Sequence, residues 1–303
     1  MNRLNFLFGL CAMFFMASCT QDEVHDLDSV CKKITATISD GVSTRTSLGE
    51  GGKVLWLQDD DISLMLKTGY HTRYVVSGAV NSNSTDFSYD NTTPSIELGK
   101  SPSCHYALYP YNVGYTLADD LNTITVDVGD WKNQIYTAGS FEDDKAVMTA
   151  KSTNYNLAFK NAFSLLNVQL SSDVPGSFSV SEISVTSKNH ALNGTATLDM
   201  SLEKPYLVCT GTSDDNKTNI LSLTTPVVLT QTPKDFYLLI PAATYEADDL
   251  TIKVKGNNEM DDTNMDWSYT MTVDVECIRS KVTTLPKQFE AESFSGSTEG
   301  DIE

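Results

Sequence analysis

The sequence predicts an all-β protein built from antiparallel β-sandwiches. Apolar and polar residues alternate in six segments, which is the pattern of a strand with one buried face. These segments are rich in the β-branched and aromatic residues that strands favour. No long stretch has the 3.6-residue period of an amphipathic helix. The expected inward-facing residues are Ile34, Ala36 and Ile38; Ile62, Leu64 and Leu66; Ile124, Val126 and Val128; Phe236, Leu238 and Ile240; Leu250, Ile252 and Val254; and Met271, Val273, Val275 and Cys277.

Ahead of these strands, residues 1–18 are predicted to be a lipoprotein signal peptide. Arg3 is their single charged residue, and the apolar block that follows is shorter than the roughly 20 residues that span a bilayer. The block ends in "MASC", which resembles the lipobox of bacterial lipoproteins. In that interpretation Cys19 is acylated, for example with palmitate, and anchors the mature chain in the outer membrane. The alternative is an ordinary secretory signal followed by an incidental cysteine.

Residues 19–30 are predicted to be an acidic linker. The acidic residues directly after Cys19 resemble the signal that exports some Gram-negative lipoproteins to the cell surface, which would make this lipoprotein surface-exposed. The alternative is a solvated linker, the usual state of an acidic run.

The charge of the chain excludes two classes of partner. It has 21 basic and 40 acidic residues, a net charge of −19. A nucleic acid backbone needs clustered Lys and Arg, so nucleic acid is not expected as a partner. Docking on anionic lipid through protein charge is disfavoured for the same reason.

The cysteines give no evidence of a metal site. Of six cysteines, Cys11 leaves with the signal and Cys19 would carry lipid. The others are far apart in the sequence, without the paired spacing of a zinc site. Buried thiols are the favoured interpretation and a disulfide remains open. These four residues are Cys31, Cys104, Cys209 and Cys277.

A domain boundary is predicted near residue 158. Apolar alternation closes one set of strands at Leu157 and Phe159 and opens another in the segment that follows. We expect an N-terminal β-sandwich over 31–158, a C-terminal β-sandwich over 159–290, and a flexible tail over 291–303.

The chain is not expected to be an enzyme. It has no G-x-S-x-G, H-E-x-x-H or P-loop motif, and its four histidines are scattered. The acidic pairs fall in turns without EF-hand spacing. No catalytic residue, metal or cofactor is therefore predicted. A glycan-binding surface would use exposed aromatic residues, for which Trp56, Trp131 and Trp267 are the candidates, although core packing is favoured for each.

Four stretches, taken together, resemble the fimbrillin (Mfa-like) family of type V pilus subunits and accessory proteins. The order and spacing of the four carry the resemblance, which covers most of the mature chain. The stretches are "STRTSL", "VLWLQDDDISLML", "CHYALYPYN" and "LAFKNAFSLLNVQL".

The resemblance implies a function and a mechanism. It implies two tandem β-sandwich domains of transthyretin-like type, and assembly into a fimbrium by strand exchange. In the family a protease cuts after an Arg behind the first strand, and a strand of another pilus subunit fills the groove by β-strand addition. The matching residue is Arg45, and the removable strand carries Ile34, Ala36 and Ile38.

The C-terminal segment departs from the pattern of a stalk subunit. Phe289 and Phe294 are five residues apart, so they would lie on opposite faces of a regular strand, and two glycines follow. This favours a tip or minor subunit that accepts a donor strand. The alternative is a non-polymerising surface lipoprotein that binds a glycan or host receptor.

Overall fold

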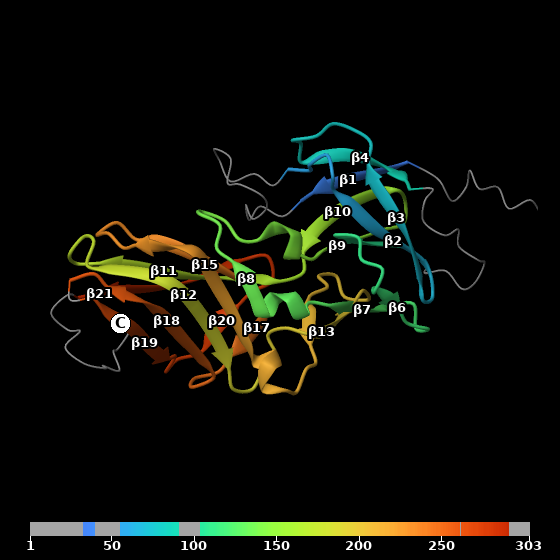
Figure 1. Ribbon diagram of the computed structural model, residues 1–303. Coiled ribbons are helices and arrows are strands. Elements are labelled where there is room, and N and C mark those ends of the chain that lie inside the picture. Colours follow the sequence, from blue (N-terminus) through green and yellow to red (C-terminus); the bar gives the residue numbers. More distant parts are fainter. Residues whose placement is uncertain (1–32, 40–54, 91–103, 261, 291–303) are drawn as a thin grey trace, which may run out of the picture. The chain divides into compact units, whose positions relative to one another are not determined.

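A computed structural model describes residues 33–39, 55–90, 104–260 and 262–290 (Figure 1). Within these ranges the chain forms 21 strands and three short 3-10 helices, with no α-helix. The prediction of an all-β fold is confirmed. Across the same ranges, no helix is long and apolar enough to cross a membrane.

Seven strands, all within residues 34–161, form a closed barrel. Neighbouring strands are antiparallel except for β1 and β10, which run parallel. In spatial order the strands are β1 (Ile34–Ile38), β10 (Asn156–Asn161), β9 (Met148–Ser152), β5 (His105–Tyr109), β2 (Asp61–Lys67), β3 (Tyr70–Val76) and β4 (Ser84–Tyr89).

Four further sheets use the remaining strands. The five-stranded sheet has the order β19 (Thr263–Thr270), β18 (Leu250–Asn258), β12 (Phe178–Ser187), β15 (Thr218–Val228) and β8 (Asn133–Ile135). The three-stranded sheet has the order β16 (Lys234–Ile240), β11 (Ser164–Ser172) and β21 (Val282–Phe289). The four-stranded sheet has the order β14 (Leu207–Cys209), β13 (Thr195–Asp199), β7 (Thr123–Asp127) and β6 (Thr116–Leu117). The last two strands, β17 (Ala243–Tyr245) and β20 (Val275–Cys277), pair with each other, and the 3-10 helices are η1 (Gly129–Lys132), η2 (Asp143–Lys145) and η3 (Asp214–Lys217).

Three clusters of buried side chains form the apolar core. One lies inside the barrel and draws only on residues up to Phe159. A second comprises residues from Leu166 onward. The third combines residues from both halves of the chain, including Trp131 and Leu198.

Two sheets also join strands from both sides of residue 158. Strand β7 pairs with β13 over five residue pairs, and β8 pairs with β15 over three. The division into domains at residue 158 remains a prediction, and any test of it must account for these shared sheets.

One predicted strand is wrong in detail. Alternation predicts that Met271, Val273, Val275 and Cys277 share a buried face, but Val273 is 61% exposed. The reason is that β19 ends at Thr270 and β20 begins at Val275, so the residues between them form a turn. The Asp274 carboxylate accepts a hydrogen bond from the Ala247 backbone, which holds this turn in place.

Candidate functional site

Strand β1 is the best candidate for a functional element, because it closes the barrel. It lies between β4 and β10, antiparallel to the first and parallel to the second (Figure 1). The Ile38 N–H donates to the Asn83 carbonyl at 2.8 Å, and the Ser39 N–H donates to the Phe159 carbonyl at 3.0 Å. Removing β1 would therefore leave two strand edges with unpaired backbone groups, and such edges recruit other strands.

The inward face of β1 completes the core of the barrel. Ile34 and Ala36 are fully buried and Ile38 is 8% exposed, in the same cluster as Trp56, Phe87 and Phe159. These are the three residues that sequence analysis predicts for the removable strand, and the structure brings them together on one buried face. Without β1 this face would become an apolar groove.

A tryptophan is hydrogen-bonded directly to the centre of β1. The Trp56 Nε1–H donates to the Ala36 carbonyl at 3.2 Å. The indole ring meets Phe87 and Phe159 edge to face, with ring centroids 5.0 and 5.4 Å away. The backbone of Trp56 is held as well, since its N–H donates to the Ser82 carbonyl and its carbonyl accepts from the Asn81 N–H, both at 2.7 Å.

The outward face of β1 is held by polar contacts to β4. Thr35 Oγ1 donates to Asp86 Oδ1 at 2.9 Å, and the Lys33 ammonium lies 2.7 Å from Asp86 Oδ2. Two residues further along β1, the hydroxyl oxygens of Thr37 and Ser84 are 3.0 Å apart. The hydrogen bonds from Lys33 and Thr35 lower the pKa of Asp86 below its ordinary value.

Two predicted site residues lie outside the described residues. Cys19 and Arg45 fall in the ranges 1–32 and 40–54, so acylation and cleavage remain predictions. The sequence pattern does not single out Asp86, and it suggests Trp56 only as a candidate for glycan stacking. Trp56 stands in one of the family-like stretches, but nothing in its local pattern indicates a bond to a strand twenty residues earlier.

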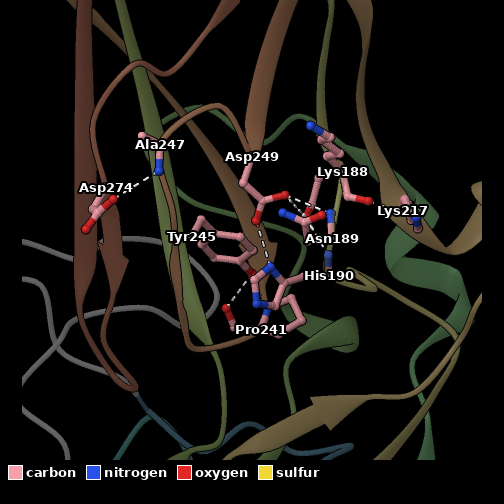
Figure 2. Close-up of polar contacts among 10 residues, drawn as sticks. Lys188, Asn189, His190, Lys217, Pro241, Tyr245, Ala247, Asp249 and Asp274 are labelled. Carbon is pink, nitrogen blue, oxygen red and sulfur yellow. Dashed lines mark hydrogen bonds and ion pairs between the residues drawn. The ribbon is translucent and has the colours of Figure 1, made fainter.

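A second polar cluster, on the turn that follows β12, combines a serine, a histidine and an aspartate. Figure 2 shows Asp249 and His190 facing each other, and the His190 Nδ1 lies 2.7 Å from Asp249 Oδ2. The Ser187 hydroxyl donates to Asp249 Oδ1 at 2.8 Å, and the Asn189 N–H donates to the same oxygen. Burial tends to raise the pKa of Asp249, but these hydrogen bonds outweigh it and the net pKa is lowered.

This cluster is not built as a catalytic triad. In a triad the serine hydroxyl is hydrogen-bonded to the histidine ring, which acts as its base. Here the Ser187 proton is directed at Asp249, and the Ser187 oxygen accepts the His190 backbone N–H at 2.8 Å. The geometry is that of a turn closed around a buried carboxylate.

Metal binding, reactive thiols and glycan stacking find little support in the described part of the chain. No group of three His, Cys, Asp or Glu residues there is placed to hold a metal ion. Cys104, Cys209 and Cys277 are free thiols, and burial raises the pKa of Cys209 to about 12. The three tryptophans considered for glycan stacking are at most 4% exposed, which agrees with packing in the core.

Comparison with known proteins agrees with the architecture. Residues 44–292 match a family model described as fimbrillin-like. A candidate cell adhesion protein from Bacteroides ovatus ATCC 8483 has a similar structure, with a TM-score of 0.54 and 11% identity over 86% of this chain and 93% of that one. A candidate cell adhesion protein from Bacteroides uniformis ATCC 8492 has a TM-score of 0.46 and 14% identity over 84% of this chain and 93% of that one. No curated protein matches the sequence.

Proposed function

Because the chain belongs to the fimbrillin-like family, we propose that it is a structural or adhesive subunit of a type V pilus, such as a tip or minor subunit. The family supports a role in pili or adhesion at the cell surface, and the role proposed here is structural rather than enzymatic. The subunit would reach the outer membrane as a surface-exposed lipoprotein anchored through Cys19. Its partners would be other pilus subunits, with a host or glycan receptor where it is adhesive.

The proposed mechanism of assembly is strand exchange. Cleavage after Arg45 would release β1 together with the lipid anchor. The observation that carries this mechanism is the buried inward face of β1, together with its pairing to β4 on one side and β10 on the other, so that its loss would expose two strand edges and an apolar face. Burial of its aliphatic side chains stabilises the uncut barrel by a few kcal/mol, at about 25 cal/mol per Å² of apolar area. The uncut protein should therefore stay monomeric.

Proteolysis of the full mature chain tests the mechanism. An Arg-specific protease should cut at Arg45 before it cuts within the barrel, and the trimmed form should bind partner subunits. Arg45→Ala should block both events. Arg45→Lys is the matched control. It keeps the positive charge but removes the arginine that an Arg-specific protease requires, so it should resist cleavage as Arg45→Ala does. Equal binding of trimmed and untrimmed protein to partner subunits would show that strand exchange is not the mechanism.

Fatty-acid labelling tests the anchor separately. The wild-type protein should incorporate labelled fatty acid in its native host, and Cys19→Ser should not. Cys11→Ser is the matched control, since it changes a cysteine that leaves with the signal peptide. Equal labelling of wild type and Cys19→Ser would overturn the lipoprotein assignment.

A second candidate function is a non-polymerising surface lipoprotein of the same fold that binds a glycan or host protein. The observation that favours it is β21, which pairs with β11 over eight residues of its own chain and buries Phe289. A strand held in this way is not free to act as a donor. Under this alternative, protein trimmed at Arg45 would still bind no partner subunit.

A further inference from the structure

We propose that the groove under β1 selects its incoming strand by two features: a small residue at the central inward position, and a basic residue directly before the first inward apolar residue. The occupant would be an extended segment of a partner subunit with the chemistry of residues 33–38, "KITATI", running in the same direction as β1. This inference rests on the proposed strand exchange and names the class of strand that can enter.

The central position is limited in volume by Trp56. Ala36 is fully buried in the same core cluster as Trp56, and its carbonyl accepts the indole Nε1–H of that residue, whose backbone N–H and carbonyl are both hydrogen-bonded. The neighbouring rings of Phe87, Phe159 and Tyr109 lie 5.0, 5.4 and 5.8 Å from the indole. A donor with Leu or Ile at this position would have to displace rings that are closely packed, which is unfavourable in a core.

The two flanking inward positions differ from the centre. Ile34 and Ile38 fill the core with branched aliphatic chains at either side of Ala36. The groove therefore accepts a large, a small and a large side chain at three alternate residues of the incoming strand. This pattern also sets the register, because a shift of two residues would bring a large side chain to the position of Ala36.

The basic residue is selected by Asp86. One carboxylate oxygen accepts from Thr35 and the other is paired with Lys33, and the side chain of Asp86 is 31% exposed. On a chain with a net charge of −19, loss of β1 would leave this carboxylate without the cation that now pairs with it. A donor strand entering in the opposite direction would not bring its leading cation to Asp86, so this contact also selects direction.

Peptide binding to cleaved protein tests the inference. To make the cut independent of Arg45, residues 43–47 are replaced by the site of a sequence-specific protease, and the released segment is removed. Fluorescent peptides containing KITATI, KITLTI or EITATI are then titrated by anisotropy. We expect the leucine peptide to bind about tenfold more weakly than KITATI or worse. The glutamate peptide should bind about two- to fivefold more weakly, an effect that disappears in about 1 M salt.

Charge reversal gives the matched control. In the Asp86→Lys protein the order of KITATI and EITATI should reverse, while the penalty for the leucine peptide should stay. If Asp86→Lys does not fold, as judged by its unfolding midpoint before cleavage, Asp86→Asn should bind both charged peptides equally. Equal binding of all three peptides to the unsubstituted groove would overturn the selectivity and leave strand exchange intact. Failure of every peptide to bind would overturn strand exchange, and this inference with it.

Discussion

Single side chains decide how firmly β1 is held, and Trp56 is the most informative of them. It supplies a hydrogen-bond donor to the Ala36 carbonyl and three edge-to-face ring contacts, all from a fully buried position. Aromatic pairs of this kind contribute beyond the area that they bury. One residue outside the barrel's strands thus links β1 to the rest of the core.

Substitution of Trp56 should destabilise the barrel in two steps. Trp56→Phe removes the donor and part of the ring and should lower the free energy of unfolding by about 1–3 kcal/mol. Trp56→Ala should cost about 3–5 kcal/mol, because it also leaves a cavity. Urea unfolding measures both values, and the exposed Val113→Ala should change stability by at most about 0.5 kcal/mol. Equal effects of Trp56→Ala and Val113→Ala would contradict the role assigned to Trp56.

The carboxylate of Asp86 should make the attachment of β1 to β4 weaker at acid pH. Hydrogen bonds from Lys33 and Thr35 lower the pKa of Asp86 from its ordinary 3.8. A lowered folded-state pKa contributes stability that is present above the ordinary value and is lost as pH falls through the lowered one. The stability difference between wild type and Asp86→Asn should therefore shrink as pH drops below about 4.

Hydrogen exchange of the amides of residues 34–38 at a series of pH values measures this effect. Asp235→Asn serves as a control, since that carboxylate bonds to Asn167 and Gln169 away from β1. A difference at β1 that stays constant across the acid range would show that Asp86 does not hold the strand through its charge.

At the scale of elements, the two ends of the described chain are held differently. Strand β1 is paired on both sides, whereas β21 is paired on one side only, with β11. Strand β21 is anchored at its end by Phe289, which is 1% exposed and whose ring lies 5.6 Å from that of Trp267 and 5.7 Å from that of Phe178. The chain is therefore docked as a strand up to Phe289, the first of the two phenylalanines whose spacing departs from the pattern of a stalk subunit.

Loss of the Phe289 side chain should detach the end of β21. Phe289→Ala should lower the free energy of unfolding by about 3–5 kcal/mol, the range for deleting a buried Phe. The exposed neighbour Gln288→Ala is the matched control and should change stability by at most about 0.5 kcal/mol. Chemical denaturation gives both numbers. A small effect at Phe289 would mean that β21 contributes little, and that it could be released as a donor strand.

At the scale of the whole molecule, the shared sheets indicate that the stabilities of the two halves are coupled. Strands β7 and β8 come from the first half of the sequence but pair with β13 and β15 of the second. The cluster around Trp131 likewise contains Leu198 and Leu239. Unfolding of one half would expose this common core, so each half stabilises the other.

Thermal unfolding should accordingly be a single cooperative transition. Calorimetry checks this, because the calorimetric and van't Hoff enthalpies agree only in a two-state process. Leu198→Ala, in the shared cluster, and Val254→Ala, in the cluster of the second half, should both shift that one transition to lower temperature. Two separate transitions, of which Val254→Ala shifts only one, would instead support independent folding units divided near residue 158.

The sequence by itself determined the fold class and the identity of most inward-facing residues. Period-two alternation is a local property, because side chains of successive strand residues point to opposite faces, so Ile34, Ala36 and Ile38 could be assigned to one buried face in advance. The same local signal failed at Val273, where a turn interrupts the alternation. The family resemblance likewise rests on short stretches that can be read along the chain.

Only the tertiary structure decided which strands meet. The parallel pairing of β1 with β10 and of β11 with β21 joins segments more than a hundred residues apart, and no turn sequence specifies such a register. The contacts of Trp56 with Ala36 and of Asp86 with Lys33 depend on the place of β1 in the barrel, where it also pairs with β4. They depend on packing between distant segments, and for this reason the strand could be predicted from sequence while the groove that holds it could not.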